Sequence, residues 1–127
     1  MAVQDTTGVN YHTHLKTEGI GYIRDKTLGV NVHSGLAVTS DGLVLGVLDP
    51  SSYNRPEAKD ESASHESKKV RPIEEKESFR WLETLKRSTA DIPEGIKVIT
   101  VYDREGDMYE LFVKATELDE SFLIRIV

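Results

Sequence analysis

Residues 98–107 constrain the fold more than any other stretch. A run of β-branched and aromatic residues, 98–102, ends at the carboxylate of Asp103, and a charged turn containing Gly106 follows. Such a run predicts a strand buried on both faces, which is typical of parallel sheets flanked by helices. Because ligands in those sheets gather at the carboxyl ends of strands, Asp103 lies where a site is expected. The simpler alternative is that Asp103 only caps a helix beginning near Gly106.

The composition limits the classes of protein that need to be considered. A length of 127 residues, with 38% hydrophobic and 30% charged residues, predicts one globular domain. The absence of cysteine excludes disulfides, thiolate nucleophiles and cysteine zinc sites. The formal net charge of −6 argues against broad affinity for nucleic acid. Since there is neither a run long enough to cross a bilayer nor a signal peptide, we expect a cytoplasmic protein without a membrane partner.

The first part of the chain predicts a short strand, a loop and a hairpin. Residues 3–6 are interpreted as the end of a strand, and residues 8–27 as a loop. Residues 29–39 alternate, which predicts a half-buried strand, and the Asp41-Gly42 turn returns the chain as an apolar strand over 43–48. The side chains expected on the buried face of the first hairpin strand are Val30, Val32, Leu36 and Val38, with Asn31, His33 and Thr39 opposite.

Three histidines are candidates for metal ligands. His12 and His14 form a His-x-His pair that could hold a metal on a strand, but without an acidic or cysteine partner nearby they are interpreted as solvated loop residues. His33, alone on its strand, is expected to pack or hydrogen-bond beside the sheet. None of the three is assigned to a site.

The second part of the chain predicts a polar loop, two helices and two strands. Residues 51–69 are expected to form a flexible polar loop. A helix is predicted from about Pro72, a strand over 96–102, a second helix from about Gly106 to Thr116, and a strand over 122–127. The buried stripes are predicted to be Ser78, Trp81, Leu82 and Leu85 on the first helix, and Met108, Leu111, Phe112 and Ala115 on the second.

This order of elements predicts an α/β fold with a mixed sheet. An antiparallel hairpin followed by helix-connected strands places the first and fourth strands side by side and parallel, with helices packed on the sheet. Asp5 and Asp103 would then lie at the same end of neighbouring strands. Two carboxylates so placed favour Mg²⁺ or Mn²⁺ and metal-assisted phosphoryl transfer.

Five motifs add a resemblance to a known family. They are Gln-Asp-Thr-Thr at 4–7, Leu-Ala-Val at 36–38, Glu-Lys-Glu-Ser with Arg-Trp-Leu across 75–82, Asp-Arg-Glu-Gly-Asp at 103–107, and Phe-Leu-Ile-Arg at 122–125. Together they resemble bacterial cut-and-paste insertion-sequence transposases of the DDE type, which have a ribonuclease H-like core. The resemblance covers nearly the whole chain except residues 8–27 and 51–69.

The resemblance implies roles for four residues. Asp5 and Asp103 match the first and second catalytic aspartates, both ligands of Mg²⁺, for which Mn²⁺ can substitute. Arg104 and Lys76 match charged positions that approach DNA phosphate, although a salt bridge on the helix surface accounts equally well for Lys76. Glu105 and Asp107, in contrast, are expected to cap the next helix.

The resemblance also implies that residues 1–127 are a truncated, partial ribonuclease H-like domain. The third acidic residue of the family lies beyond the last strand, and Glu110 and Glu117 are on the wrong helix to replace it. The longer protein would cleave DNA at transposon ends and join it to target DNA, as a homodimer in the DNA complex. These 127 residues alone are expected to be inactive, with weak or no DNA binding.

Two other classes of function stay open. One is a ribonuclease H-like nuclease that hydrolyses DNA without joining strands, and the other is a noncatalytic binding or regulatory module. The second predicts no response to Mg²⁺ or Mn²⁺ at Asp5 and Asp103.

Overall fold

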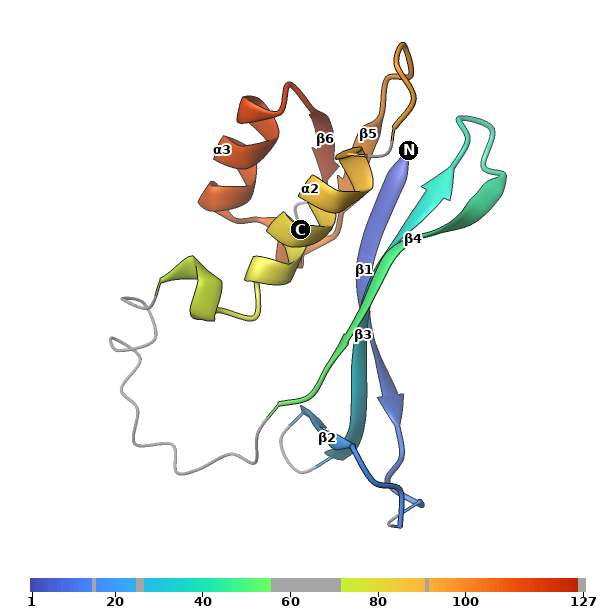
Figure 1. Ribbon diagram of the computed structural model, residues 1–127, viewed down its shortest axis with the longest axis vertical. Helices are drawn as coiled ribbons and strands as arrows, with labels where there is room; N and C mark the ends of the chain where they lie inside the picture. The colour runs from blue at the N-terminus through green and yellow to red at the C-terminus, as the bar shows by residue number, and fades with distance from the viewer. Residues whose placement is uncertain (15, 25–26, 56–71, 91, 126–127) are drawn as a thin grey trace. The chain divides into compact units, whose positions relative to one another are not determined.

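The computed structural model of the chain describes residues 1–14, 16–24, 27–55, 72–90 and 92–125 (Figure 1). The elements are β1 Ala2–Asn10, β2 Gly21–Arg24, β3 Thr27–Val38, β4 Val44–Tyr53, η1 Ile73–Glu75, α2 Phe79–Ala90, β5 Ile99–Tyr102, η2 Arg104–Gly106, α3 Tyr109–Glu117 and β6 Ser121–Ile124. The chain divides into two compact units, and β1, β3 and β4 each run from one to the other. The first unit comprises Met1–Asp5, Ser34–Pro50 and Ile73–Val127, and the second comprises Thr6–His33 and Ser51–Pro72.

The first unit contains a mixed sheet. β1 pairs with β5 in parallel, Ala2 opposite Thr100 and Val3 opposite Val101, and β5 pairs in parallel with β6. β3 lies on the other side of β1, and β4 pairs with β3. The predicted α/β class is therefore confirmed, together with the parallel pairing of the first strand with the first helix-connected strand.

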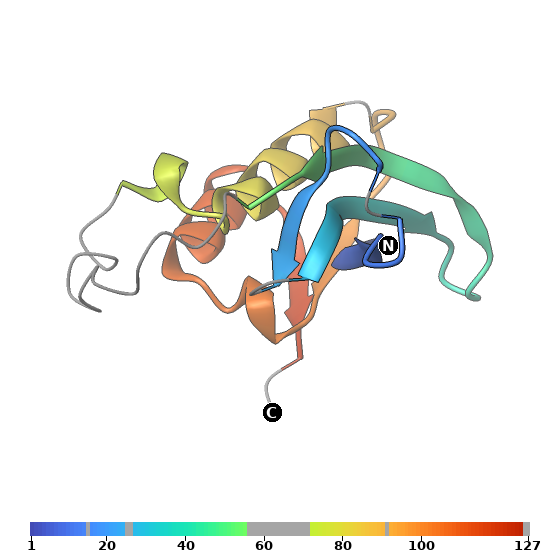
Figure 2. The same ribbon diagram turned by 90° about the horizontal axis from the view of Figure 1, so that it is seen from below.

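Helices α2 and α3 cover one face of β5 and β6 in this unit (Figures 1 and 2). The core comprises Trp81, Leu82, Leu85, Tyr102, Leu111 and Ala115. The rings of Trp81 and Tyr102 meet edge to face with centroids 5.8 Å apart, a favourable geometry for aromatic pairs. Both predicted stripes supply this core, and complete burial of a leucine stabilises a fold by about 1.5–3 kcal/mol.

Both helices begin later than predicted. The turn η1 precedes α2, which starts at Phe79 rather than near Pro72. The turn η2 likewise precedes α3, which starts at Tyr109. Proline and acidic residues are compatible with the first turn of either helix type, so the sequence signals did not distinguish a 3₁₀ turn from an α-helix.

The prediction that the strand β5 is buried on both faces was wrong. Thr100 and Tyr102 are buried under the helices, whereas Ile99 is 44% exposed. Since α2 and α3 lie on one side only, the β-branched run alternates between a covered and an open face. The last strand ends at Ile124, and residues 126–127 of the predicted strand lie outside the described residues.

The predicted faces of the hairpin were also wrong. The buried residues of β3 are Gly29, Asn31, His33 and Gly35, whereas the valines opposite are only half-buried. The apolar start of β4 is open to solvent, with Leu43, Val44, Leu45 and Val47 all 57–66% exposed. Alternation separates two faces, but it does not show which one a distant element covers.

The second unit replaces the predicted loop over 8–27 with strands. β1 extends to Asn10, and β2 pairs antiparallel with β3, Gly21 opposite Gly29. A Cβ at Gly29 would lie 2.2 Å from the carbonyl oxygen of Val9, so the close approach of these backbones requires glycine.

The predicted polar loop over 51–69 is described only at its start. β4 continues through Tyr53, and Arg55 forms an isolated antiparallel bridge with Tyr22. The guanidinium of Arg55 donates to the carbonyl oxygen of Ile23 at 2.7 Å. Residues 56–69 lie outside the described residues. Across the described part of the chain, no helix is long and apolar enough to cross a membrane.

Candidate functional site

The register of β1 with β5 determines how Asp5 and Asp103 lie. Val3 is opposite Val101, the last pair of this ladder; Asp5 lies two residues further along β1, and Asp103 follows the end of β5 at Tyr102. Neighbouring strands are about 4.8 Å apart, which is close enough for two carboxylates to share one cation. The pairing at the start of β1 is compatible with the predicted juxtaposition of Asp5 and Asp103, which stays a prediction.

Both carboxylates leave the sheet on the face away from the helices. Along β1, Ala2 and Gln4 are buried and Asp5 is exposed, and along β5 Tyr102 is buried and Asp103 is exposed. Because successive side chains of a strand point to opposite faces, Asp5 and Asp103 share the open face. A ligand that is itself charged, such as a nucleic-acid phosphate, can reach this face without entering the core.

Asp103 also acts as a cap, but of the turn η2 rather than of the helix near Gly106 that the simpler interpretation predicted, since Met108 is the N-cap of α3. Asp103 has an extended backbone, and its Oδ1 accepts a hydrogen bond of 2.8 Å from the backbone N–H of Glu105. At the other end of the turn, the N–H of Asp107 donates to the carbonyl oxygen of Arg104. An ionised carboxylate has about four acceptor positions, so one N–H bond leaves room for a cation. Capping and metal binding are therefore compatible at Asp103.

The carboxylates of Asp5 and Asp103 can supply only some of the ligands that a hard divalent cation needs. Carboxylate oxygens are the ligands that Mg²⁺ prefers, and Mg²⁺ keeps several waters when one or two carboxylates bind it. The described residues contain no group of three His, Cys, Asp or Glu side chains that could hold a metal ion. Two carboxylates on an open face therefore fit weak binding of a Mg²⁺ ion that keeps several of its water ligands.

The two basic residues suggested by the resemblance differ in environment. Lys76 lies 3.9 Å from Glu110 (Nζ to Oε1), and both side chains are partly exposed. A salt bridge was the alternative account of Lys76, but Lys76 lies between η1 and α2 rather than on a helix, and only its partner Glu110 is on one. Arg104 is exposed in η2, directly after Asp103. Of the two basic candidates, Arg104 is thus the one that directly follows a carboxylate of the pair, Asp103, in the sequence.

Glu110 and Glu117 lie on α3 and pair with lysines of the helical layer. Lys114 Nζ lies 2.7 Å from Glu117 Oε2, and this hydrogen bond and charge lower the pKa of Glu117. Since α3 covers the face opposite Asp5 and Asp103, neither glutamate supplies a third carboxylate to the pair.

The histidines lie as expected. His12 and His14 are exposed, with His14 edge-on to the ring of Tyr11 at 6.2 Å. His33 is fully buried, and its Nδ1 lies 2.8 Å from Thr6 Oγ1. The expectation that His33 hydrogen-bonds beside the sheet is confirmed.

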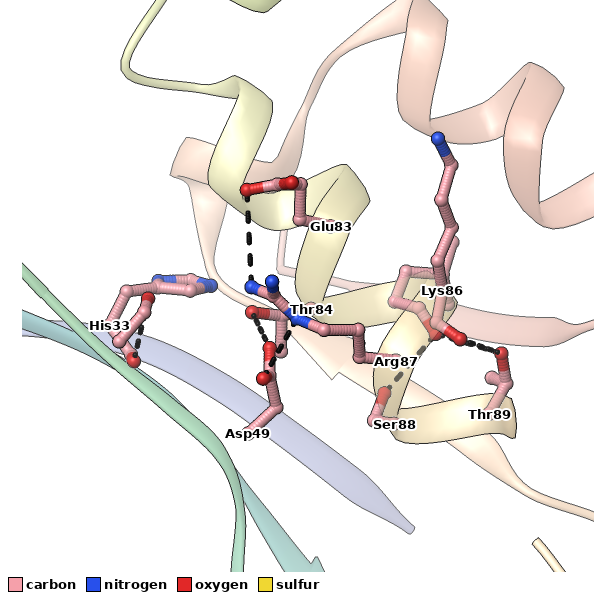
Figure 3. Close-up of polar contacts among 10 residues, drawn as sticks. His33, Asp49, Glu83, Thr84, Lys86, Arg87, Ser88 and Thr89 are labelled. Carbon is pink, nitrogen blue, oxygen red and sulfur yellow. Dashed lines mark hydrogen bonds and ion pairs between the residues drawn. The ribbon is translucent and has the colours of Figure 1, made fainter. Parts of the chain in front are cut away.

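A polar cluster around Asp49 was not predicted (Figure 3). Asp49 Oδ1 lies 2.8 Å from Arg87 Nε, and Asp49 Oδ2 accepts a hydrogen bond of 3.1 Å from Thr84 Oγ1. Glu83 lies 3.9 Å from the same guanidinium. The only sequence signal was the Asp49-Pro50 dipeptide, which was interpreted as the end of the hairpin. The cluster joins β4 to α2 and is structural in character.

Comparison with known proteins gives no family assignment. No protein-family model matches the chain, and no curated protein matches it either.

Proposed function

We propose that this chain is the part of a DDE-type DNA transposase core that carries the first two catalytic aspartates, Asp5 and Asp103. The observation that carries the proposal is the parallel pairing of β1 with β5, which supports a position at the same end of neighbouring strands for the two exposed carboxylates. The five motifs that resemble insertion-sequence transposases point to the same two residues. The strand arrangement is compatible with the ribonuclease H-like core that this resemblance implies.

In this proposal Asp5 and Asp103 hold Mg²⁺ against a DNA phosphate. When bound, Mg²⁺ would supply an activated water or hydroxyl and offset charge on the phosphate oxygens. The Glu105 N–H holds the Asp103 carboxylate in one orientation, which lowers the cost of ordering it around a cation. Arg104 contributes a positive charge to the adjacent DNA backbone.

The charge of the chain limits what it does alone. A formal charge of −6 opposes accumulation of DNA, since nonspecific affinity comes from neutralising phosphates with Lys and Arg. In a longer protein, basic domains would bring transposon ends and target DNA to the carboxylates, and a third acidic residue would complete the metal site. Cleavage at the ends and joining to target DNA are proposed for that longer protein only.

Titration with Mn²⁺ followed by backbone NMR tests the metal pair. Paramagnetic broadening is expected to centre on Asp5 and Asp103 and to weaken in Asp103→Asn and in Asp5→Asn. Asp41→Asn is the matched control, because it removes one exposed carboxylate from the β3–β4 turn and should leave the broadening unchanged. Broadening centred on His12 and His14, or unchanged by Asp103→Asn, contradicts the proposal.

The same titration distinguishes a noncatalytic module from the two kinds of enzyme. A noncatalytic module predicts no broadening at the two aspartates, whereas a ribonuclease H-like nuclease predicts the same broadening as a transposase. The two enzymes differ in whether a longer protein containing these residues joins a 3′ hydroxyl to a second DNA molecule. An assay of strand transfer with labelled DNA ends makes that distinction.

A further inference from the structure

An apolar cavity lies in the first unit, away from the carboxylates. Its volume is about 520 Å³, and it is bounded by the start of β1, the β3–β4 turn, the end of α2 and residues 92–99. Met1, Leu45, Ile96 and Ile99 line it and remain 42–66% exposed. Among the described lining residues, Lys97 is the only one with a charged side chain. The cavity is thus apolar, and the charged groups of its described lining are two cations, Lys97 and the N-terminal ammonium of Met1, which donates to the carbonyl oxygen of Val38.

The β3–β4 hairpin beside this cavity carries an apolar tip. Leu43, Val44, Leu45 and Val47, here called the tip cluster, are 57–66% exposed, and β4 lies at the edge of the sheet within this unit. The stretch 42–48 contains no charged residue. Asp41, at the turn, is fully exposed and accepts a hydrogen bond from Thr39 Oγ1, which fixes its carboxylate at the tip. The tip is therefore apolar with a single anion.

We propose that the tip cluster of one chain docks into the cavity of a second copy, with Asp41 of each chain facing Lys97 of the other. An apolar surface with one carboxylate complements an apolar cavity whose charged groups, Lys97 and the N-terminal ammonium of Met1, are both cations. Leu45 belongs to both the tip cluster and the cavity lining, so the two surfaces are contiguous on each chain. Contiguous, mutually complementary surfaces can make both contacts at once around a two-fold axis, which is the commonest symmetry of homodimers.

A second copy explains more of the surface than a small ligand does. An apolar molecule that fills the cavity would leave Leu43, Val44 and Val47 in water, whereas reciprocal docking covers the tip and the cavity together. Apolar patches of this kind on a protein surface mark interaction sites. The proposed dimer does not use Asp5 or Asp103 and is independent of the metal proposal.

Sedimentation velocity over a range of concentrations up to about 1 mM tests the proposal, because dissociation constants of weak complexes fall in or below this range. The unmodified chain is expected to pass from monomer to dimer as its concentration rises. Leu43→Asp should abolish dimer formation. Leu123→Asp is the matched control, since Leu123 on β6 is 61% exposed and Leu43 is 62% exposed, and it should leave the association unchanged.

A charge exchange tests the pairing itself. Asp41→Lys and Lys97→Asp should each weaken the dimer about three- to tenfold, and the double variant should restore it, because a surface ion pair is worth up to about a factor of five and the two-fold axis makes two of them. Backbone NMR spectra verify that each variant keeps the fold. A chain that stays monomeric throughout, a Leu43→Asp variant that dimerises normally, or a double variant no better than the single ones overturns the proposal.

Discussion

Arg87 Nε of α2 lies 2.8 Å from Asp49 Oδ1 of β4, and Thr84 Oγ1 donates to the other carboxylate oxygen. Asp49 adopts φ 42°, a left-handed conformation that aspartate tolerates better than most residues. Its backbone turns the chain within β4, and its side chain ties that point to α2. One acidic residue therefore connects the hairpin with the helical layer of the first unit.

Thr84→Val is predicted to lower the free energy of unfolding by about 1 kcal/mol. The hydroxyl is fully buried and donates to a charged acceptor, so its loss removes a hydrogen bond without changing the side-chain volume much. Urea denaturation at neutral pH measures the effect. Lys114→Gln, which breaks the exposed pair with Glu117, is the control and should change stability by less than about 0.5 kcal/mol. Equal losses in both variants would contradict a special role for the Asp49 cluster.

Leu111→Ala is predicted to lower the free energy of unfolding by about 2–5 kcal/mol, the usual cost of a cavity at a buried leucine. Leu111 has no exposed surface and packs with Leu85 and Tyr102 in the core of the first unit. Val113→Ala, two residues further along α3, should cost less than about 1 kcal/mol because Val113 is 38% exposed. The comparison of the two denaturation midpoints checks which face of α3 is buried.

Local periodicity was sufficient to predict the helical layer from the sequence. The spacing of Trp81, Leu82 and Leu85, and of Leu111 and Ala115, identifies the buried faces, because a helix of this size has one apolar stripe. The parallel pairing of β1 with β5 was also predictable, since a helical connection between neighbouring strands imposes it. Asp5 and Asp103 were placed together by that rule of topology and by the motifs, without any signal from residues between them.

The sheet faces could not be predicted in the same way. Val30 and Val32 read as the buried face of β3, yet Asn31 and His33 are the residues removed from water. Burial of these polar side chains depends on contacts with residues far away in the chain, such as Thr6 with His33. β2 was missed because its four residues carry no alternation, and its pairing with β3 is a contact that local sequence does not predict.

Glu120 and Glu117 are predicted to affect the pH dependence of stability in opposite directions. Burial, and then the charge of Asp119, raise the pKa of Glu120 above its ordinary value of 4.5. The contribution of Glu120 to the free energy of unfolding is therefore full below pH 4.5 and is lost as the pH rises through the raised pKa. The pKa of Glu117 is lowered by Lys114, so its contribution is present above pH 4.5 and is lost as pH falls through the lowered pKa.

The corresponding glutamine variants test these signs. At neutral pH, Glu120→Gln should be more stable than the unmodified chain and Glu117→Gln less stable. The Glu120→Gln difference should shrink as the pH falls through the raised pKa of Glu120 toward 4.5, and the Glu117→Gln difference as the pH falls from 4.5 through the lowered pKa of Glu117. Urea denaturation at a series of pH values measures them. Parallel pH profiles for the two variants would show that the local environments of these glutamates do not differ in the way described.

Gly106→Ala is predicted to destabilise the fold by about 1–3 kcal/mol and to disturb the turn that Asp103 caps. A Cβ at Gly106 would lie 2.6 Å from Cβ and 3.0 Å from Cγ of Tyr102, and Tyr102 is held in the core against Trp81. Because neither side chain can withdraw from such a contact without opening the core, the backbone of η2 must shift, which is the cost of overpacking. The shift should move the Glu105 N–H away from Asp103 and so weaken Mn²⁺ broadening, although both aspartates remain.

Gly46→Ala is the matched control, because a Cβ there meets nothing within 4 Å. It should change stability by less than about 0.5 kcal/mol and leave the Mn²⁺ broadening unchanged. Loss of stability in Gly106→Ala with full Mn²⁺ broadening would separate the core from the carboxylate pair and contradict the proposed role of η2 in orienting Asp103.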